Sequence, residues 1–436
     1  MTSLPPTPRR AAVVGANRIP FGKVGGAYAS ASNKDMLTAA VEGLVARHGL
    51  AGLRLDEVAA GAVLKHSRDF NLAREAVLGS SLDPRTPAHD VQRACATGLE
   101  TVLGVANKIA LGQAEVGIGG GVDSASDAPI VVSDRLRRML LGVSRARSPR
   151  ERLKILARLR PADLKPVAPD VAEPRTGLSM GEHQALTTAH WQVSREAQDA
   201  LALASHQRLA AAYERGFFDD LMTPYRGLVR DQSLRGDTSL EKLGKLKPVF
   251  GTDGPSPTMT AGNSTPLSDG ASAVLLAGDE WAQARNLPVL AHVVDAQTAA
   301  VDFVRGGEGL LMGGSYATSA LLARRGLTLA DFDLVEIHEA FASTVLATLA
   351  AWADPAFCRD RLGLDGPLGE IDPERLNVTG SSLAAGHPFA ATGGRIVGTL
   401  AKLLAEKRST TGETARGLIS VCAAGGQATA MILEAA

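Results

Sequence analysis

The feature that most constrains the fold of this chain is an alternation of short apolar strands, tight turns and helices. In the N-terminal part, residues 11–15 and 58–63 have the apolar pattern of buried strands. Residues 35–48 carry apolar side chains at helical spacing, and the pattern ends at Gly49. Because such alternation is typical of sheets covered by helices, we expect an α/β fold with mostly parallel sheets.

The C-terminal third repeats the alternation. It predicts strands at residues 334–337, 376–379 and 417–421, with helices at residues 340–352 and 393–407. The two parts share little residue identity, so a duplication of α/β halves is inferred from the pattern alone.

The region between the two parts has a different character, with more charge and more helical pattern. Ser194, for example, is expected to cap a helix that runs to about Arg215. We therefore interpret residues 123–248 as an inserted helical loop domain. The N-terminal half then comprises residues 1–122 with 249–282, and the C-terminal half residues 283–436.

Charge is balanced over the chain but not along it. The 46 basic and 46 acidic residues give a formal net charge of zero, which offers no support for nucleic-acid binding. Residues 134–165, however, hold eleven Lys or Arg against three Asp or Glu, and two amphipathic helices are expected there. This segment could touch an anionic membrane surface, dock a partner subunit, attract substrate phosphates or be a solvated face.

The cysteine count and the apolar runs indicate the compartment. Three cysteines are too few for a disulfide framework, and they suit a reduced chain. The first ten residues lack the apolar run of a signal peptide, and no run approaches the ~18 residues of a membrane span. We expect a cytoplasmic enzyme.

Cys95 lies in the turn between a predicted strand at residues 89–93 and a predicted helix at residues 98–111. Backbone N–H groups at a helix N-terminus stabilise a thiolate, so we expect the pKa of Cys95 to fall. The same N–H groups can bind an oxyanion. Cys95 is therefore either a nucleophile or a small buried apolar residue.

Two histidines and a second cysteine lie in loops or at the ends of predicted strands. His387 lies between a glycine and a proline, where it is either a structural histidine or a general base for a thiol. Cys422 and His338 each follow an apolar strand. No metal site is predicted, because Glu336–Glu339 lacks the H-E-x-x-H pattern and no other ligand pair has metal spacing.

Together these motifs resemble the thiolase family, in order and in approximate spacing. The four motifs that carry the resemblance are Ala94-Cys95-Ala-Thr-Gly98, His338-Glu-Ala-Phe341, Gly386-His387-Pro388 and Cys422-Ala-Ala-Gly-Gly426. Further matches are Arg18-Ile-Pro-Phe-Gly22, Gly177-Leu-Ser-Met-Gly-Glu-His183, Arg195-Glu-Ala-Gln-Asp199 and the segment 259–270.

The resemblance covers nearly the whole chain and is strongest to the thiolase (beta) subunit of fatty-acid oxidation trifunctional complexes. His338 stands where many thiolases carry Asn, and the basic insertion is shared with that subunit. Ala96-Thr97 departs from the Gly-Ser that is commoner after this cysteine, and we expect Thr97 to reshape the acyl pocket.

The resemblance implies a thiolase fold, in which two duplicated α/β halves form a five-layer αβαβα sandwich with an inserted helical loop domain. It also implies 3-ketoacyl-CoA thiolase activity, in which CoA cleaves 3-ketoacyl-CoA to acetyl-CoA and a shortened acyl-CoA. CoA is then a substrate, and neither a metal nor a separate cofactor is expected.

The resemblance also assigns roles to site residues. Cys95 is the nucleophile that carries the acyl group, His387 is its base, and Cys422 exchanges protons with acetyl-CoA and with CoA. His387 and a water held by His338 form one oxyanion site, and the backbone N–H groups of Cys95 and Ala424 form the other. We expect His338 to add a pH dependence, since histidine can charge near neutrality.

For substrate binding, the resemblance implies a CoA site across the loop domain and the Ser264–Thr265 turn, with His183 and Met180 along the pantetheine or acyl path. It further implies a homodimer or a dimer of dimers. A partner subunit with hydratase and dehydrogenase activities is also expected.

Three other functions stay open at this point. The chain could be a biosynthetic thiolase that forms acetoacetyl-CoA, a ketoacyl synthase, or a non-catalytic lipid-binding or scaffold subunit. Cys422 argues against a synthase, which needs no second acid–base thiol, and the complete set of four motifs argues against a scaffold. The insertion favours degradation of medium or long acyl chains.

Overall fold

Ten strands form one continuous mixed sheet in the computed structural model, which describes residues 8–169, 172–254 and 257–436. Nine of them follow the order β10-β11-β12-β9-β1-β8-β5-β3-β4, and β2 pairs with β8. The strands of this sheet are β1 (Ala11–Arg18), β2 (Gly22–Lys23), β3 (Glu57–Ala60), β4 (Ala88–Asp90), β5 (Val116–Asp123), β8 (Ser268–Gly278), β9 (Ala291–Ala300), β10 (Leu334–Ile337), β11 (Arg416–Ala423) and β12 (Gln427–Ala435). A separate pair is formed by β6 (Pro248–Phe250) and β7 (Met259–Thr260).

The sheet consists of two halves with the same strand order. In the first half, β8 runs antiparallel to β1 and β5, and β3 runs parallel to β5. In the second half, β12 runs antiparallel to β9 and β11, and β10 runs parallel to β11. The halves join where residues 11–13 of β1 pair with residues 291–293 of β9. The repetition agrees with duplicated halves, but the expectation of mostly parallel sheets is wrong, because β8 and β12 oppose both of their neighbours.

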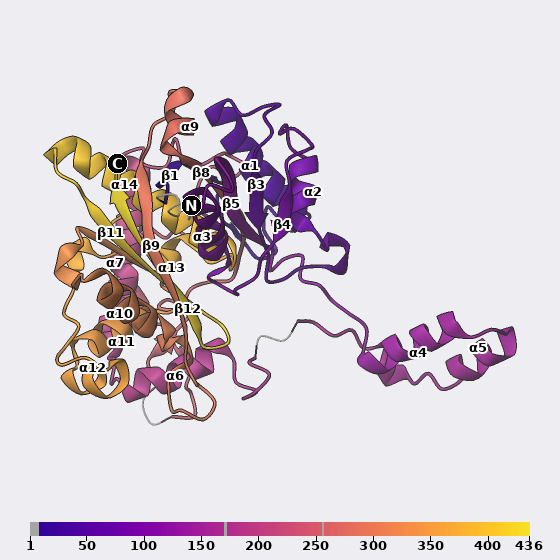
Figure 1. Cartoon of the computed structure of the whole chain (residues 1–436). Coiled ribbons are helices and arrows are strands. Elements are labelled where there is room, and N and C mark those ends of the chain that lie inside the picture. The colour runs from indigo at the N-terminus through magenta and orange to yellow at the C-terminus, as the bar shows by residue number, and fades with distance from the viewer. Residues whose placement is uncertain (1–7, 170–171, 255–256) are drawn as a thin grey trace, which may run out of the picture.

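Helices and half-sheets alternate in five layers (Figure 1). Helices α3 and α14 pack on each other between the two half-sheets, α1 and α2 cover the outer face of the first half, and α10 and α11 cover that of the second. The α-helices are α1 (Asn33–His48), α2 (Leu72–Leu78), α3 (Thr97–Ala110), α4 (Asp134–Arg145), α5 (Pro149–Leu156), α6 (Met180–His190), α7 (Arg195–Glu214), α8 (Leu240–Gly244), α9 (Asp279–Ala284), α10 (Gly313–Arg325), α11 (Ala342–Ala353), α12 (Pro355–Leu362), α13 (Ser382–Ala385) and α14 (Ala391–Thr411).

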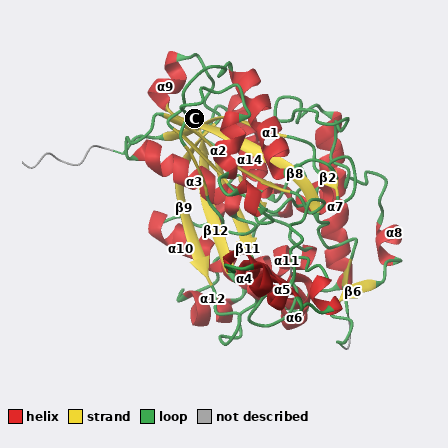
Figure 2. Cartoon of the chain, turned by 90° about the vertical axis from the view of Figure 1, so that its right-hand side faces the viewer, coloured by secondary structure: helices red, strands yellow, loops and turns green. Residues whose placement is uncertain are grey.

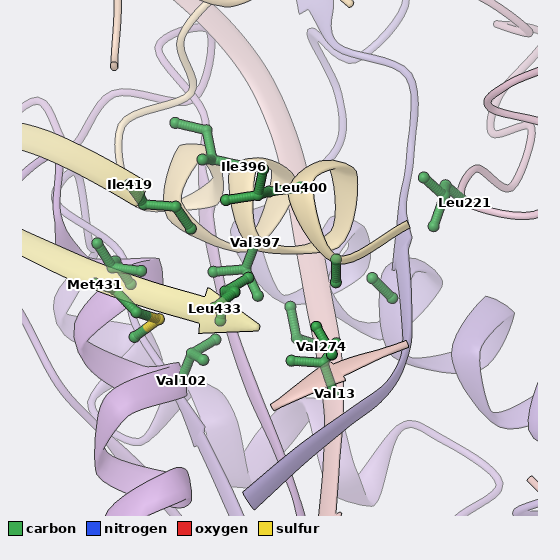
Figure 3. Close-up of a cluster of buried hydrophobic side chains, with 14 of the residues drawn as sticks. Val13, Val102, Leu221, Val274, Ile396, Val397, Leu400, Ile419, Met431 and Leu433 are labelled. Carbon is green, nitrogen blue, oxygen red and sulfur yellow. The ribbon is translucent and has the colours of Figure 1, made fainter. Parts of the chain in front are cut away.

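The central layer is where the two halves share a core. Figure 3 shows Val102 of α3 and Leu400 of α14 among side chains from strands of both halves, including Val13 and Leu433. The two helices cross at glycines: a Cβ on Gly393 would lie 2.1 Å from the backbone nitrogen of Leu99. This close crossing brings the start of α14 against the start of α3, and both helix starts border the site described below.

Most predicted elements form near the expected residues, but the strand predicted at residues 376–379 is wrong. Asn377 has a left-handed backbone, with φ of 47°. Its side-chain amide replaces the strand hydrogen bonds, since Asn377 Oδ1 accepts from Ile337 N at 2.9 Å and Asn377 Nδ2 donates to Ile337 O at 3.0 Å. Only one bridge, between Val335 and Leu376, marks where the strand was expected.

The described residues between 123 and 248 contain no strand of the main sheet beyond the end of β5, and they hold helices α4 to α8. Helices α4 and α5 form a hairpin that projects from the body (Figure 1), and it faces the viewer in Figure 2. Ser194 caps α7, as predicted, and Ser148 caps α5. The domain boundaries stay a prediction, and residues 1–7 of the predicted polar tail lie outside the described residues.

Among the described residues, the structure has no helix with both the length and the apolar character needed to cross a bilayer.

Candidate active site

Cys95 sits in a strained turn between β4 and α3. Ala94, directly before it, has φ of 43°, which is a left-handed conformation that a side chain rarely adopts. The hydroxyl of Thr97 holds the turn, because it accepts from Arg93 N at 2.8 Å and donates to Ala94 O at 2.7 Å. Thr97 is thus a support of the Cys95 turn, a role that we did not anticipate.

Two histidines converge on the Cys95 sulfur. Cys95 Sγ and one ring nitrogen from each of His338 and His387 lie within 4.8 Å of one another, and the two ring centroids are 4.2 Å apart. The Nδ1 atoms are occupied, by Ser382 Oγ at 2.9 Å for His338 and by Thr392 Oγ1 at 2.6 Å for His387. Both Nε2 atoms are buried without a hydrogen-bond partner among the described residues. They are therefore free to bind a reacting molecule.

Cys422 comes from the opposite half of the molecule, at the end of β11. It is buried beside Phe341 and Met259, and its thiol lies close enough to Cys95 for the two groups to interact electrostatically. The following turn reverses the chain through Gly425 and Gly426, whose φ angles are 78° and 73°.

Two contacts fix this Cys422 turn, and the sequence did not reveal either. Glu173 accepts from Gly425 N at 2.6 Å, so the loop domain holds the turn. Arg93 donates to Gln427 Oε1 at 2.9 Å, which ties the Cys95 turn to the Cys422 hairpin. No spacing in the sequence links these distant residues.

The pKa of Cys95 is raised to about 12, contrary to our expectation that it would fall. Burial of the sulfur is the largest cause. Backbone N–H groups of Ala424 and of Cys95 itself act in the opposite direction, but they do not outweigh burial. Burial, together with the nearby Cys95, also raises the pKa of Cys422. Both thiols are therefore protonated at rest.

Both histidines are neutral at rest. Burial lowers the pKa of His387 to about 3, and the charge of Arg395 adds to the effect. Burial, His387 and Arg395 hold the pKa of His338 well below its ordinary value. The pH dependence near neutrality that we expected from His338 is therefore wrong, because this ring does not charge in that range.

A buried carboxylate organises the loops that carry the histidines. Glu339 accepts from Ser205 Oγ at 2.8 Å, from Leu383 N at 3.0 Å and from Asn377 Nδ2 at 2.9 Å. These contacts join the segment after His338 to the loop before His387 and to α7. The sequence motif contained Glu339, but its role as an anchor follows only from the contacts.

The residues predicted for CoA binding lie around this centre. Thr265 donates through its hydroxyl to Glu339 O and through its backbone to Ala340 O, while the Ser264 hydroxyl is buried without a partner among the described residues. Met180 packs in the apolar cluster that contains Cys422. His183 lies in the same helix as Met180, and its Nε2 is 2.7 Å from Thr176 Oγ1.

A cavity of about 790 Å³ adjoins this cluster. Its lining includes His183, Phe303 and Leu310, and the last two side chains also pack in the cluster around Cys422. The wall is more apolar than polar, although Glu308, Asp354, Asp360 and Arg361 are part of it, and neither thiol lines the cavity directly.

Cys95, His338 and His387 are also the residues that come closest to a metal-ligand set among the described residues. Zinc sites in proteins use such thiolate and imidazole ligands, usually four in a structural site. Here three side chains meet, and hydroxyl groups hold the Nδ1 atoms of both histidines.

Known proteins match the chain over nearly its whole length. Models of the thiolase N-terminal domain and the thiolase C-terminal domain match residues 11–280 and 287–435. The chain is 42% identical over 431 residues to a 3-ketoacyl-CoA thiolase of Yersinia pestis (strain Pestoides F), covering 98% of this chain and 97% of that protein.

Solved structures of acyltransferases also superpose on this chain. The acetyl-CoA acetyltransferase of Bacillus anthracis superposes with a TM-score of 0.80 at 28% identity, covering 99% of this chain and 100% of that one. Human mitochondrial 3-ketoacyl-CoA thiolase in complex with CoA superposes with a TM-score of 0.78 at 28% identity, covering 98% of both chains. With family models across both halves and a full-length relative at this identity, the chain belongs to the thiolase family of acyltransferases.

Proposed function

We propose that the protein is a 3-ketoacyl-CoA thiolase that works through an acyl group on Cys95. The observation that carries the proposal is the convergence of the Cys95 sulfur with two neutral imidazoles, beside a second protonated thiol. One thiol can hold an acyl group while the other moves protons, and a thiolytic cleavage needs both functions.

In the first half-reaction, His387 Nε2 takes the proton of Cys95, and the thiolate attacks the 3-keto carbonyl. The C2–C3 bond then breaks, and its electron pair passes to the departing acetyl-CoA. Cys422 donates the proton that the resulting carbanion needs, which a thiol with a raised pKa can do because it is protonated at rest.

In the second half-reaction, Cys422 takes the proton of incoming CoA. The CoA sulfur attacks the acyl group on Cys95, the shortened acyl-CoA leaves, and the proton on His387 returns to Cys95. Neither a metal nor a separate cofactor takes part in the proposed sequence, and CoA is a substrate.

Two oxyanions form along this path. The Nε2 atoms of His338 and His387 face one of them, His338 with or without an intervening water. The N–H groups of Ala424 and Cys95, which already interact with the Cys95 sulfur, serve the other. Ser264, Thr265, Met180 and His183 are proposed to hold CoA and the acyl chain.

The degradative direction and the preference for medium or long acyl chains are part of the proposal. The cavity lined in part by Phe303 and Leu310 supports an extended acyl chain, because it offers a mostly apolar volume that adjoins the cluster around Cys422. A biosynthetic thiolase, which joins two acetyl groups, would not use that volume.

We further propose that the hairpin of residues 134–165 contacts an anionic membrane surface. Its basic side chains share the hairpin with exposed apolar ones, among them Leu140, Leu153, Leu156 and Leu164. Attraction to anionic headgroups with burial of apolar side chains is how cationic amphipathic helices bind membranes. The projection of the hairpin from the body makes it a poor candidate for drawing CoA to the thiols (Figure 1).

The assembly follows the resemblance. A homodimer or dimer of dimers, a hydratase–dehydrogenase partner subunit and a cytoplasmic location are carried forward as proposals on that basis.

The direct test is thiolysis of short, medium and long 3-ketoacyl-CoA by the purified chain with CoA present. Wild type should cleave them, and Cys95→Ala should not. Cys358→Ala is the matched control, because Cys358 is buried in α12 against Ala351 O and Trp352 O. If wild type cleaves none of these substrates, the non-catalytic scaffold function takes the place of this proposal.

A further inference from the structure

We propose that Arg395 and Ser382 hold His338 in a single tautomer, with its proton on Nε2, where it can only donate a hydrogen bond to the substrate. The inference rests on the thiolase function proposed above and adds two positioning residues to it. The ring nitrogen of His338 that points away from Cys95, Nδ1, contacts the hydroxyl of Ser382.

That contact is part of a buried chain of three groups. Ser382 Oγ lies 2.9 Å from His338 Nδ1, and Arg395 Nη2 donates to Ser382 Oγ at 3.1 Å. His338 and Ser382 are fully buried and Arg395 is nearly so, which leaves bulk water no access to the chain.

The direction of the hydrogen bonds follows from the inventory of donors. A guanidinium only donates, so Ser382 Oγ accepts from Arg395. The single hydroxyl proton of Ser382 then has His338 Nδ1 as its acceptor, which requires that Nδ1 carries no proton. The opposite tautomer would leave a buried hydroxyl proton without a partner, which is unfavourable where bulk water has no access.

Arg395 is itself held in place, so the chain begins from a fixed charge. Burial lowers the pKa of Arg395, but the nearby carboxyl groups of Glu336 and Glu339 act in the opposite direction, and a second hydrogen bond runs to Ser381 Oγ at 3.0 Å. A proton on Nε2 and a neutral ring make His338 a pure donor at the substrate side. Because a nitrogen that carries a proton cannot ligate a metal, the same chain disfavours a metal site at Cys95, His338 and His387.

The contrast with His387 explains how two adjacent imidazoles serve different purposes. Its Nδ1 also meets a hydroxyl, that of Thr392, but no described cation donates to that hydroxyl. His387 can therefore donate from Nδ1 to Thr392 and keep Nε2 open to receive the Cys95 proton. Arg395 donates to the hydroxyl that contacts His338, which makes His338 a fixed donor. The hydroxyl that contacts His387 has no such cation among the described residues, so His387 can act as a base.

The tautomer can be measured without reference to activity, by ¹⁵N NMR of histidine-labelled enzyme with His338→Asn for assignment. The expected spectrum of His338 at neutral pH has a protonated Nε2 and an unprotonated Nδ1. A protonated Nδ1 would overturn the inference, whatever reaction the enzyme catalyses.

The functional arm is a double-mutant cycle. Ser382→Ala should lower kcat by about 10- to 100-fold, as expected when an oxyanion donor is misoriented, with KM for CoA changed by less than about twofold. In a His338→Ala background the same substitution should have no further effect. An equal loss in both backgrounds would contradict an action through His338.

Matched variants separate the hydroxyl from packing. Ser382→Thr keeps the hydroxyl. It should retain more activity than Ser382→Val, because valine has the shape of threonine but no hydroxyl. Ser381→Ala removes the other hydroxyl bound by Arg395 and should lower kcat by less than about threefold. An inactive wild type would count against the thiolase proposal. If wild type is active but Ser382→Thr and Ser382→Val have equal activity, only the proposed role of Ser382 in holding the His338 tautomer is contradicted.

Discussion

Burial sets the protonation state of the residues at the centre of this site. The helix N-terminus at Cys95 led us to expect a lowered thiol pKa, yet the structure raises it, because the groups around the sulfur exclude water more effectively than two N–H groups stabilise a charge. In the proposed mechanism, the thiolate then forms together with the attack on substrate, with His387 as the acceptor of its proton.

This account predicts how Cys95 responds to alkylation. With a pKa of about 12, the thiolate fraction of Cys95 grows by about tenfold per pH unit, so iodoacetamide should modify Cys95 ever faster from pH 6 to pH 9. Mass spectrometry resolved by peptide measures the rate, and buried Cys358 serves as the unreactive control. A rate that levels off below pH 8 would show a stabilised thiolate instead.

The sequence identified the reactive residues of the site but not the groups that tune them. Cys95, His338, His387 and Cys422 stand in recognisable motifs, and the structure brings them together. Ser382, Thr392 and Arg395 act through contacts on the far side of the histidine rings, and nothing in their spacing predicts those contacts. Burial, which decides the pKa values, is likewise a property of the folded chain.

At the scale of elements, the crossing of α3 and α14 positions both halves of the site. Gly393→Ala would place a Cβ against the backbone of Leu99, so the helices would have to separate, at an expected cost of about 1–3 kcal/mol in the free energy of unfolding. Gly104→Ala is the matched control, because an added Cβ there meets open space and should stabilise α3 by up to about 1 kcal/mol. Chemical denaturation measures the free energy of unfolding of both variants. Equal changes in the two would contradict a tight crossing of α3 and α14 at Gly393.

The α4–α5 hairpin yields a second prediction at this scale. Reversing the charges of Arg145, Arg147 and Arg150 to Glu should weaken binding to anionic vesicles by about 100-fold or more, since each basic residue near such a surface contributes about 1 kcal/mol. Vesicle co-sedimentation measures the loss, and zwitterionic vesicles give the baseline.

The control for the hairpin is an equal reversal elsewhere, at the exposed residues Lys34, Arg54 and Arg325. That variant should bind anionic vesicles with less than about a threefold loss, and thiolysis in solution should stay the same in both variants. Equal losses of vesicle binding in the two variants would show a nonspecific charge effect. If wild type does not bind anionic vesicles, the membrane proposal is wrong, and docking of a partner subunit becomes the preferred function of the hairpin.

Elements with a local pattern were predictable, and elements defined by pairing were not. Helix α1 begins after Ser32 and ends at Gly49 because capping and glycine signals are local. The strand expected at residues 376–379 failed because an asparagine side chain supplies the hydrogen bonds of a strand. Parallel or antiparallel direction cannot be derived from apolar runs, so the mixed sheet was mistaken for a mostly parallel one.

At the scale of the whole molecule, buried neutral histidines make stability depend on pH. Burial lowers the pKa of His206 to about 4, while the unfolded chain titrates at the ordinary value near 6.5. Between these values the unfolded state binds a proton that the folded state does not, so stability is lost as the pH falls below about 6.5.

His206→Asn tests this dependence away from the thiols. Its amide oxygen can replace Nδ1, which accepts from Arg235 N at 3.2 Å, but it does not titrate. The variant should lose about 2 kcal/mol less stability than wild type between pH 7 and pH 5. Urea unfolding at the two pH values measures the difference, and parallel losses would show that this histidine is not buried as described.

The two halves of the molecule meet to supply one thiol each, and the central claim is that Cys95 carries the acyl group between two half-reactions. Incubation of wild type with a 3-ketoacyl-CoA in the absence of free CoA should release acetyl-CoA and leave the shortened acyl group on the enzyme. Peptide mass spectrometry should find that acyl mass on Cys95, with none on Cys358 or Cys422, and added CoA should remove it as acyl-CoA. An acyl group on Cys422 alone, or acetyl-CoA release with no acylated cysteine, would contradict the account.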